Sequence, residues 1–166
     1  YDVTREYYVN DAGVQIDHLA DSLKARYLQE FGIECDVPDD GYHGPEIIAL
    51  AKELKEKVGD AYVKDIDAHT EDFKDFGKAR LLDAIKEDLH QFRVDQDVYT
   101  SEKEIRDRGD VEKVLEQLRP FCYEKEGALW LDTTKDGDDK DRVLIKSDGN
   151  YTYLLPDIAY HNDKFN

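Results

Sequence analysis

The start of the chain orders a strand before a helix, and this order constrains the fold more than any other feature. Residues 3–9, VTREYYV, are rich in the β-branched and aromatic side chains that strands favour. Residues 10–13, NDAG, break the run, and apolar residues then recur at helical spacing as far as Phe31, before Gly32. Strand, turn and helix in this order predict an α/β fold. The turn then lies at the carboxyl end of the strand, where such sheets bind ligands.

The middle of the chain is predicted to be mostly helical. Pro45 suits the first turn of a helix that continues to Val58. A longer helix is predicted to begin near Thr70, whose hydroxyl can cap it. A further helix is predicted from a cap at Asp110 to Pro120. The long helix carries an apolar stripe that we expect to be core: Phe73, Phe76, Ala79, Leu82, Ile85, Leu89 and Phe92.

Strand and turn signals flank the last of these helices. Residues 95–101, DQDVYTS, predict a short strand. Residues 121–131, FCYEKEGALWL, predict a β-hairpin that turns near Glu126-Gly127. Residues 141–157, DRVLIKSDGNYTYLLPD, predict two strands joined at Asp148-Gly149, followed by a helix.

Charge composition narrows the classes of partner. The formal net charge is -17, and charged residues make up 38% of the chain. An acidic surface repels phosphate backbones, so we expect no DNA partner, and an RNA partner would need basic surface supplied from elsewhere. No run of about 18 apolar residues and no leader segment occurs. These features predict a soluble, cytoplasmic protein that does not bind membranes.

Metal-binding patterns fail when their spacing is tested. The acidic string at 132–141 would need a bidentate glutamate at its twelfth position, where Val143 stands. No pair of histidines has the close spacing of a zinc motif, and Cys35 and Cys122 lie far apart. We therefore predict no metal site, and motif logic alone finds no complete active site.

Several stretches match one family in order and spacing. They are REYYVNDAGVQIDHLA, ARYLQEFG, DDGYHGPEII, DFGKARLLDAIKEDL, DVYTSE and EKEGALWLDTTKDGDDKDRVLIKSDGNYTYLLPDIAYHNDKF. Together they resemble the catalytic domain of arginyl-tRNA synthetases of the bacterial type, over essentially the whole chain. The resemblance implies part of a class I, Rossmann-like catalytic domain. It assigns residues 1–34 to the first strand and helix, 35–140 to a largely helical connective insertion with a β-hairpin, and 141–166 to the return into the catalytic fold.

The resemblance also implies an activity. Such enzymes activate L-arginine with ATP, accompanied by Mg²⁺, release pyrophosphate, and pass the arginyl group to the terminal ribose of arginine tRNA. The family's ATP signatures, of the His-x-Gly-His and Lys-Met-Ser-Lys-Ser types, do not occur in this chain. We therefore expect an internal fragment that is inactive by itself. The alternative is a free-standing acidic module that binds other proteins and catalyses nothing.

The resemblance assigns Tyr153 and Asp157 to the arginine pocket. A guanidinium favours a planar carboxylate partner, and we expect Asp157 to lie where a strand ends, facing the crevice of the sheet. The alternative from the residues alone is that Asp157, after Pro156, only caps the following helix.

Two further assignments follow from the resemblance. Glu102, with Tyr99 beside it, is a candidate to face the 3′ end of the tRNA; the alternative is a solvated glutamate. Asn10 and Asp11 are candidates to border the active-site crevice, and either could instead cap the helix that follows.

Overall fold

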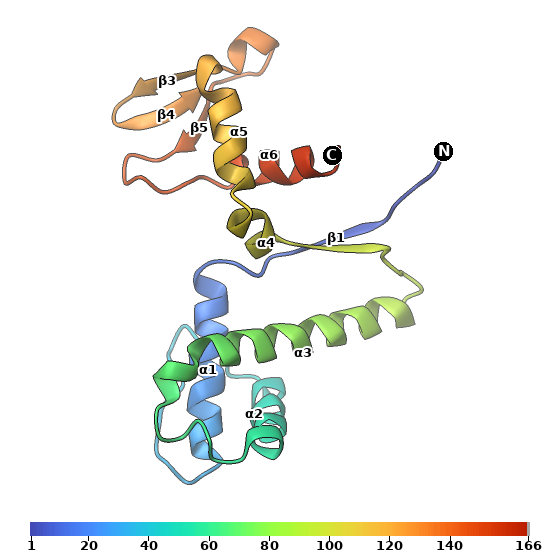
Figure 1. The fold of residues 1–166 in the computed structure, drawn as a ribbon, viewed down its shortest axis with the longest axis vertical. Coiled ribbons are helices and arrows are strands. Elements are labelled where there is room, and N and C mark those ends of the chain that lie inside the picture. The colour runs from blue at the N-terminus through green and yellow to red at the C-terminus, as the bar shows by residue number, and fades with distance from the viewer. Residues whose placement is uncertain (166) are drawn as a thin grey trace. The chain divides into compact units, whose positions relative to one another are not determined.

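A computed structural model describes residues 1–165, and its contacts divide the chain into two compact units (Figure 1). Unit 1 comprises Tyr1–Arg5 and Asp11–Val98, and unit 2 comprises Glu6–Asn10 and Tyr99–Asn166. Each unit has its own cluster of buried apolar side chains. The boundaries between catalytic fold and insertion, at 34/35 and 140/141, stay a prediction.

Unit 1 is a helical body built from α1 (Val14–Gln29), α2 (Pro45–Val58) and α3 (Thr70–Gln91), with the short 3-10 helix η1 (Ile66–His69) before α3. The ring of Tyr27 packs edge-on against Phe73, with centroids 5.5 Å apart, and its hydroxyl donates to the Gly59 carbonyl at 2.6 Å. The buried members of the core are Leu19, Ala20, Leu23, Tyr27, Ile47, Ala51, Leu54 and Phe73. The helices predicted after Pro45 and near Thr70 are confirmed.

Only the first part of the α3 stripe is core. Phe73 is 0% exposed, whereas Ile85 is 37% and Phe92 is 82% exposed. Figure 1 shows α3 continuing well past α1 and α2, so these helices do not cover its later turns. The prediction that the whole stripe is buried is therefore wrong for the later turns.

Both predicted helix caps are displaced by one residue. Thr70 is the first residue of α3, and its hydroxyl donates to the Asp67 carbonyl at 2.7 Å. Asp110 is likewise the first residue of α5 (Asp110–Leu118), and its carboxylate accepts from Arg108 and Lys113. In each case the side chain is engaged elsewhere, so it does not cap the helix.

Unit 2 contains two small sheets. In the first, β1 (Glu6–Val9) pairs with β2 (Val98–Ser101), and both predicted strands are confirmed with shorter bounds. The strands run in the same direction, because their starts lie together: the carbonyl of Arg5, just before β1, accepts from the backbone N–H groups of Asp97 and Val98 at 2.8 and 3.1 Å. The mixed α/β class is thus confirmed.

The second sheet is antiparallel, in the order β3 (Cys122–Lys125), β4 (Ala128–Leu131) and β5 (Arg142–Ile145). Glu126 and Gly127 both have positive φ angles, 54° and 76°, as a type I′ hairpin turn requires. The predicted hairpin at 121–131 is confirmed. The short 3-10 helices η2 (Arg119–Phe121) and η3 (Thr134–Asp136) adjoin this sheet.

The strand predicted after Asp148-Gly149 is wrong. Beyond β5 the chain turns back and forms a single bridge, Ile145↔Tyr151. Helix α6 (Leu154–Asp163) then begins at once. Pro156 lies in its first turn, where a missing backbone N–H interrupts no helical hydrogen bond.

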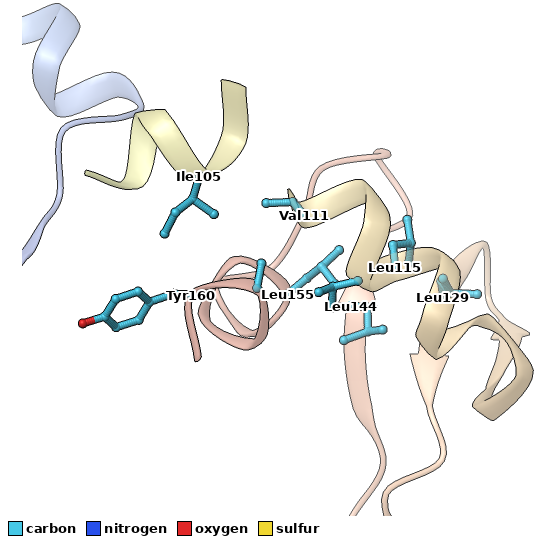
Figure 2. Packing of buried hydrophobic residues seen from close by; sticks show 9 residues of the cluster. Ile105, Val111, Leu115, Leu129, Leu144, Leu155 and Tyr160 are labelled. Carbon is cyan, nitrogen blue, oxygen red and sulfur yellow. The ribbon is translucent and has the colours of Figure 1, made fainter. Parts of the chain in front are cut away.

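The core of unit 2 forms between this sheet and three helices. Figure 2 shows Ile105 of α4 (Glu102–Asp107), Val111 of α5, Leu144 of β5 and Leu155 of α6 pointing toward one another. Each of them is at most 1% exposed. Since α4 and α6 share this core, their remaining faces are held close to β1.

An exposed ion pair links the residues that directly precede β1 and β2. The backbone N–H, Nε and Nη2 of Arg5 all donate to Asp97, at 2.8, 3.1 and 2.9 Å. These hydrogen bonds lower the pKa of Asp97 to about 2. Because the pKa is lowered, the stabilisation from this pair is present above the ordinary aspartate pKa of about 4 and is lost as the pH falls through about 2.

We expect Arg5→Gln to raise the pKa of Asp97 toward its ordinary value, because the charged donor is removed while the backbone donor stays. The chemical shift of the Asp97 carboxyl carbon, followed by NMR between pH 1.5 and 6 (about two units either side of 3.8), measures the change. The same titration on His90→Gln, which removes an exposed partner of Asp95, serves as the control. An unchanged Asp97 pKa in Arg5→Gln would contradict the assignment of the shift to this ion pair.

Candidate functional site

The carboxyl end of β1 brings the Tyr8 side chain close to two acidic residues of unit 2. Burial and the nearby carboxylates of Glu102 and Asp157 raise the pKa of the Tyr8 hydroxyl. The Tyr8 ring lies 4.6 Å from that of Tyr160. Residues from β1, α4 and α6 thus converge on one hydroxyl, although they lie far apart in the sequence.

Glu102 is the buried member of this group. It is 8% exposed, so the alternative of a solvated glutamate is wrong. Glu102 is the first residue of α4, which Ser101 caps by accepting the Glu104 N–H at 3.1 Å. One turn later, Arg106 donates from Nε and Nη2 to Oε1 of Glu102, at 2.9 and 2.6 Å. A buried carboxylate is therefore held by a charged fork on its own helix.

The other acidic residue, Asp157, lies in the first turn of α6. Tyr153, Asp157 and Tyr160 recur at the spacing that places residues on one helix face. Tyr153 is 87% exposed, and Asp157 is exposed and makes no ion pair with any residue that the structure describes. The Asp157 N–H donates to the Tyr153 carbonyl at 3.1 Å, so the backbones of the two residues are joined by a helical turn.

Two expectations for Asp157 need correction. It does not lie at the end of a strand, because α6 has already begun at Leu154. It is not the helix cap either, because Tyr153 occupies that position and makes no capping hydrogen bond with its side chain. Asp157 instead lies in the first turn of the helix, where a negative charge suits the helix dipole.

A second polar network, centred on Glu6, links β1, β2 and the residue that follows α6. Glu6 of β1 accepts a hydrogen bond from Thr100 of β2 and pairs with Lys164 at 3.1 Å. Burial raises the pKa of Glu6, but hydrogen bonds from Thr100, Lys164 and Tyr160 outweigh it, so the net pKa is lowered. Both strands and the end of α6 are therefore joined through one ionised carboxylate.

The remaining predicted site residues have separate environments. Tyr99 is half-buried, with its ring 5.7 Å from Tyr7. Asn10 is exposed in unit 2, whereas Asp11 belongs to unit 1, is 4% exposed and pairs with Lys78 at 3.3 Å. Neither caps α1, because Gly13, at φ 91°, is its N-cap and no side chain makes the capping hydrogen bond.

Sequence reasoning missed Tyr8 and Arg106. A signal existed for Arg106, because an acidic residue four positions before an arginine is a favourable pair on a helix. No local signal existed for Tyr8, whose partners come from α4 and α6.

Two classes of feature are absent from residues 1–165. None of the helices in that range is both long and apolar enough to cross a membrane. The same residues contain no group of three or more histidine, cysteine, aspartate or glutamate side chains placed to hold a metal ion.

Comparison with known proteins gives the family. The family model described as "tRNA synthetases class I (R), catalytic domain" matches residues 1–166. The chain belongs to the arginyl-tRNA synthetase family. An arginine–tRNA ligase from Anoxybacillus flavithermus is 54% identical over 167 residues, which cover 99% of this chain and 30% of that protein. The arginine–tRNA ligase of Bacillus subtilis is 50% identical, with the same coverage.

Solved structures of the arginyl-tRNA synthetase family have a similar fold. A putative arginyl-tRNA synthetase from Campylobacter jejuni has a TM-score of 0.84 and 38% identity, over 99% of this chain and 36% of that one. The arginyl-tRNA synthetase of Thermus thermophilus, at 22% identity and a TM-score of 0.57, shares the fold over 96% of this chain and 29% of its own. The chain thus spans about 30% of the length of the curated relatives that it matches.

Proposed function

We propose that the chain is part of an arginine–tRNA ligase and contributes the arginine-binding wall of its catalytic domain. In the proposed reaction, the arginine carboxylate attacks the α-phosphate of ATP and displaces pyrophosphate. The terminal ribose hydroxyl of arginine tRNA then takes the arginyl group from the adenylate, which leaves as AMP. We further propose that residues 1–34 and 141–166 belong to a Rossmann-like catalytic fold and that 35–140 are its connective insertion.

The observation that carries this proposal is the environment of Asp157. Glu102 already has a charged partner in Arg106, whereas Asp157 is exposed and makes no ion pair with any described residue. A carboxylate in that state can accept two parallel hydrogen bonds from a guanidinium. Tyr153 precedes it by one helical turn and offers a ring and a hydroxyl on the same face. Together they form a short acidic and aromatic wall for the arginine side chain.

We propose that Glu102 and Tyr99 face the 3′ end of the tRNA. Arg106 occupies one oxygen of the Glu102 carboxylate, and a carboxylate has further lone pairs that can accept from a ribose hydroxyl. Of the two candidates to border the active-site crevice, we propose only Asn10, which is exposed. Asp11, buried against Lys78, is assigned to holding unit 1 together.

The contribution of this chain to catalysis is binding and orientation. Holding the arginine by its guanidinium directs the distant carboxylate toward the nucleotide, and positioning of this kind supplies much of the rate in reactions between bound substrates. Mg²⁺ is proposed to accompany the nucleotide phosphates. No cluster within residues 1–165 fits a metal, so no step of the reaction is assigned to this ion here.

The proposal predicts a difference between the 166-residue chain and the full-length protein. We expect the full-length protein to catalyse arginine-dependent exchange of pyrophosphate into ATP when arginine tRNA is present. We expect the chain alone to give only the background rate, because it lacks the two ATP signatures whose groups would stabilise the charge that develops on the phosphates.

Parallel assays with arginine, with lysine and without amino acid supply the control for specificity. Exchange above background by the chain alone would contradict the predicted inactivity of the fragment. A full-length protein without arginine-dependent exchange would overturn the ligase proposal and favour the acidic interaction module.

A further inference from the structure

The structure assigns to Arg106 the role of a positioning residue that orients the Glu102 carboxylate at the proposed tRNA-facing side of the site. This inference rests on the proposed function, because it needs Glu102 to meet a substrate. It adds a residue that lies outside the wall formed by Tyr153 and Asp157.

The contacts of Arg106 hold one oxygen of the Glu102 carboxylate in place. Nε and Nη2 both donate to Oε1 of Glu102, at 2.9 and 2.6 Å. Two donors of one planar guanidinium hold that oxygen more firmly than a single point charge would, and Oε2 is left for another donor. Because the residues are one turn apart on α4, the contact forms as soon as that helix does.

Burial makes a charged partner for Glu102 important. Glu102 is 8% exposed, and a buried carboxylate without a partner is costly. The structure also places Tyr8 near Glu102, and Asp157 near Tyr8, but neither side chain supplies a positive charge. Arg106 supplies it, with Nη2 2.6 Å from Oε1 of Glu102.

Arg106 is itself too exposed to act as a simple core residue. Its side chain retains 41% of its accessible surface. Loss of its charge therefore removes little packing. The expected effect of the substitution is on the orientation of the Glu102 carboxylate.

The test uses the full-length enzyme and compares Arg106→Gln, Glu102→Gln and the double variant. We expect Arg106→Gln to lower kcat/KM for arginine tRNA on the order of tenfold to a hundredfold, as misplacement of a positioned group does, while the KM for ATP stays near that of the parent. Arg106→Lys keeps the charge without the fork and is expected to recover part of the loss.

The double variant decides whether Arg106 acts through Glu102. If it does, Glu102→Gln combined with Arg106→Gln loses no more than Glu102→Gln alone, since the group being oriented is already altered. Lys103→Gln is the matched control, because Lys103 pairs with Asp107 at the same spacing on α4. It is expected to resemble the parent. Thermal melting of every variant shows whether folding is intact.

Each outcome has a separate meaning. If Glu102→Gln leaves all kinetic constants unchanged, the proposed role of Glu102 fails, and the inference fails with it. If Glu102→Gln is impaired but folded Arg106→Gln is not, or if the two losses add, the positioning role is overturned while the proposed function stands. If Arg106→Gln does not fold, the same comparison is made with Arg106→Lys, and parent-like kinetics there overturn the role of the fork.

Discussion

In a full-length enzyme that carries this chain, Asp157→Asn is expected to raise the KM for arginine at least about thirtyfold, with a much smaller change in the KM for ATP. Removing one partner of a desolvated, hydrogen-bonded charge pair costs roughly 2 to 5 kcal/mol. At about 1.4 kcal/mol for each factor of ten, the lower end of that range corresponds to about thirtyfold.

Asp157→Asn removes the charge of the side chain and keeps its shape. Asparagine keeps the size of the side chain, and the backbone hydrogen bond from residue 157 to the Tyr153 carbonyl does not involve the carboxylate. Asp157 is neither a helix cap nor part of an ion pair among the described residues, so its replacement breaks no described ion pair or capping hydrogen bond of the side chain. A loss of arginine affinity in Asp157→Asn is therefore attributable to the lost interaction between the carboxylate and the guanidinium of arginine.

Pyrophosphate exchange at varied arginine, in the presence of arginine tRNA, measures this effect, with circular dichroism as the check on folding. Asp163→Asn is the matched control on α6, because Asp163 pairs with Arg108 at 2.8 Å on the same helix, and we expect an arginine KM like that of the parent. Tyr153→Phe should have a smaller effect than Asp157→Asn, since it removes one hydroxyl and keeps the ring. An arginine dependence of folded Asp157→Asn that matches the parent would remove Asp157 from the pocket.

The parts of the fold that the sequence predicted correctly depend on local chemistry. Glu126-Gly127 turns the β3–β4 hairpin as expected, because a two-residue turn with positive φ angles needs few other contacts. Pro45 opens α2 as expected, for the similar reason that its fixed φ suits a first turn. The family resemblance was also visible in the sequence, and the family match over residues 1–166 confirms it.

The segment before Asp157 was mispredicted because its local signals conflict. Residues 151–155, YTYLL, are aromatic and apolar, and a short run of that kind is compatible with either a strand or a helix. The prediction placed the end of a strand at Asp157, directly after Pro156, but a proline is equally compatible with the first turn of a helix. Packing of Leu155 and Ala159 into the core of unit 2 favours the helix.

The burial of Glu102 and the exposure of the later part of α3 both depend on which partners are present. Glu102 is covered together with Tyr8, which is distant in the sequence and gives no local signal. The α3 stripe has one helical period throughout, but α1 and α2 cover only its first turns. Periodicity predicts which face of a helix is apolar and leaves open how far along the helix that face is covered.

That difference along α3 leads to the largest expected effect on stability. Phe73→Ala in the 166-residue chain is expected to lower the free energy of unfolding of unit 1 by about 3 to 5 kcal/mol, because a buried aromatic ring is lost and a cavity remains. Phe73 is fully buried and contacts the rings of Tyr27 and Tyr62 edge-on, at centroid distances of 5.5 and 5.8 Å. Those contacts would be lost together with the apolar burial.

Phe92→Ala supplies a control with the same change of side chain. Phe92 follows the last turn of the same α3 and is largely exposed, so its removal is expected to change the free energy of unfolding by less than about 0.5 kcal/mol, as for most surface substitutions. Urea unfolding followed by circular dichroism at 222 nm, the wavelength of helical signal, compares both variants with the parent chain. Equal losses in the two variants would show that the later turns of α3 are as well packed as the first. A parent-like Phe73→Ala would show that the Tyr27, Tyr62 and Phe73 cluster is not the core of unit 1.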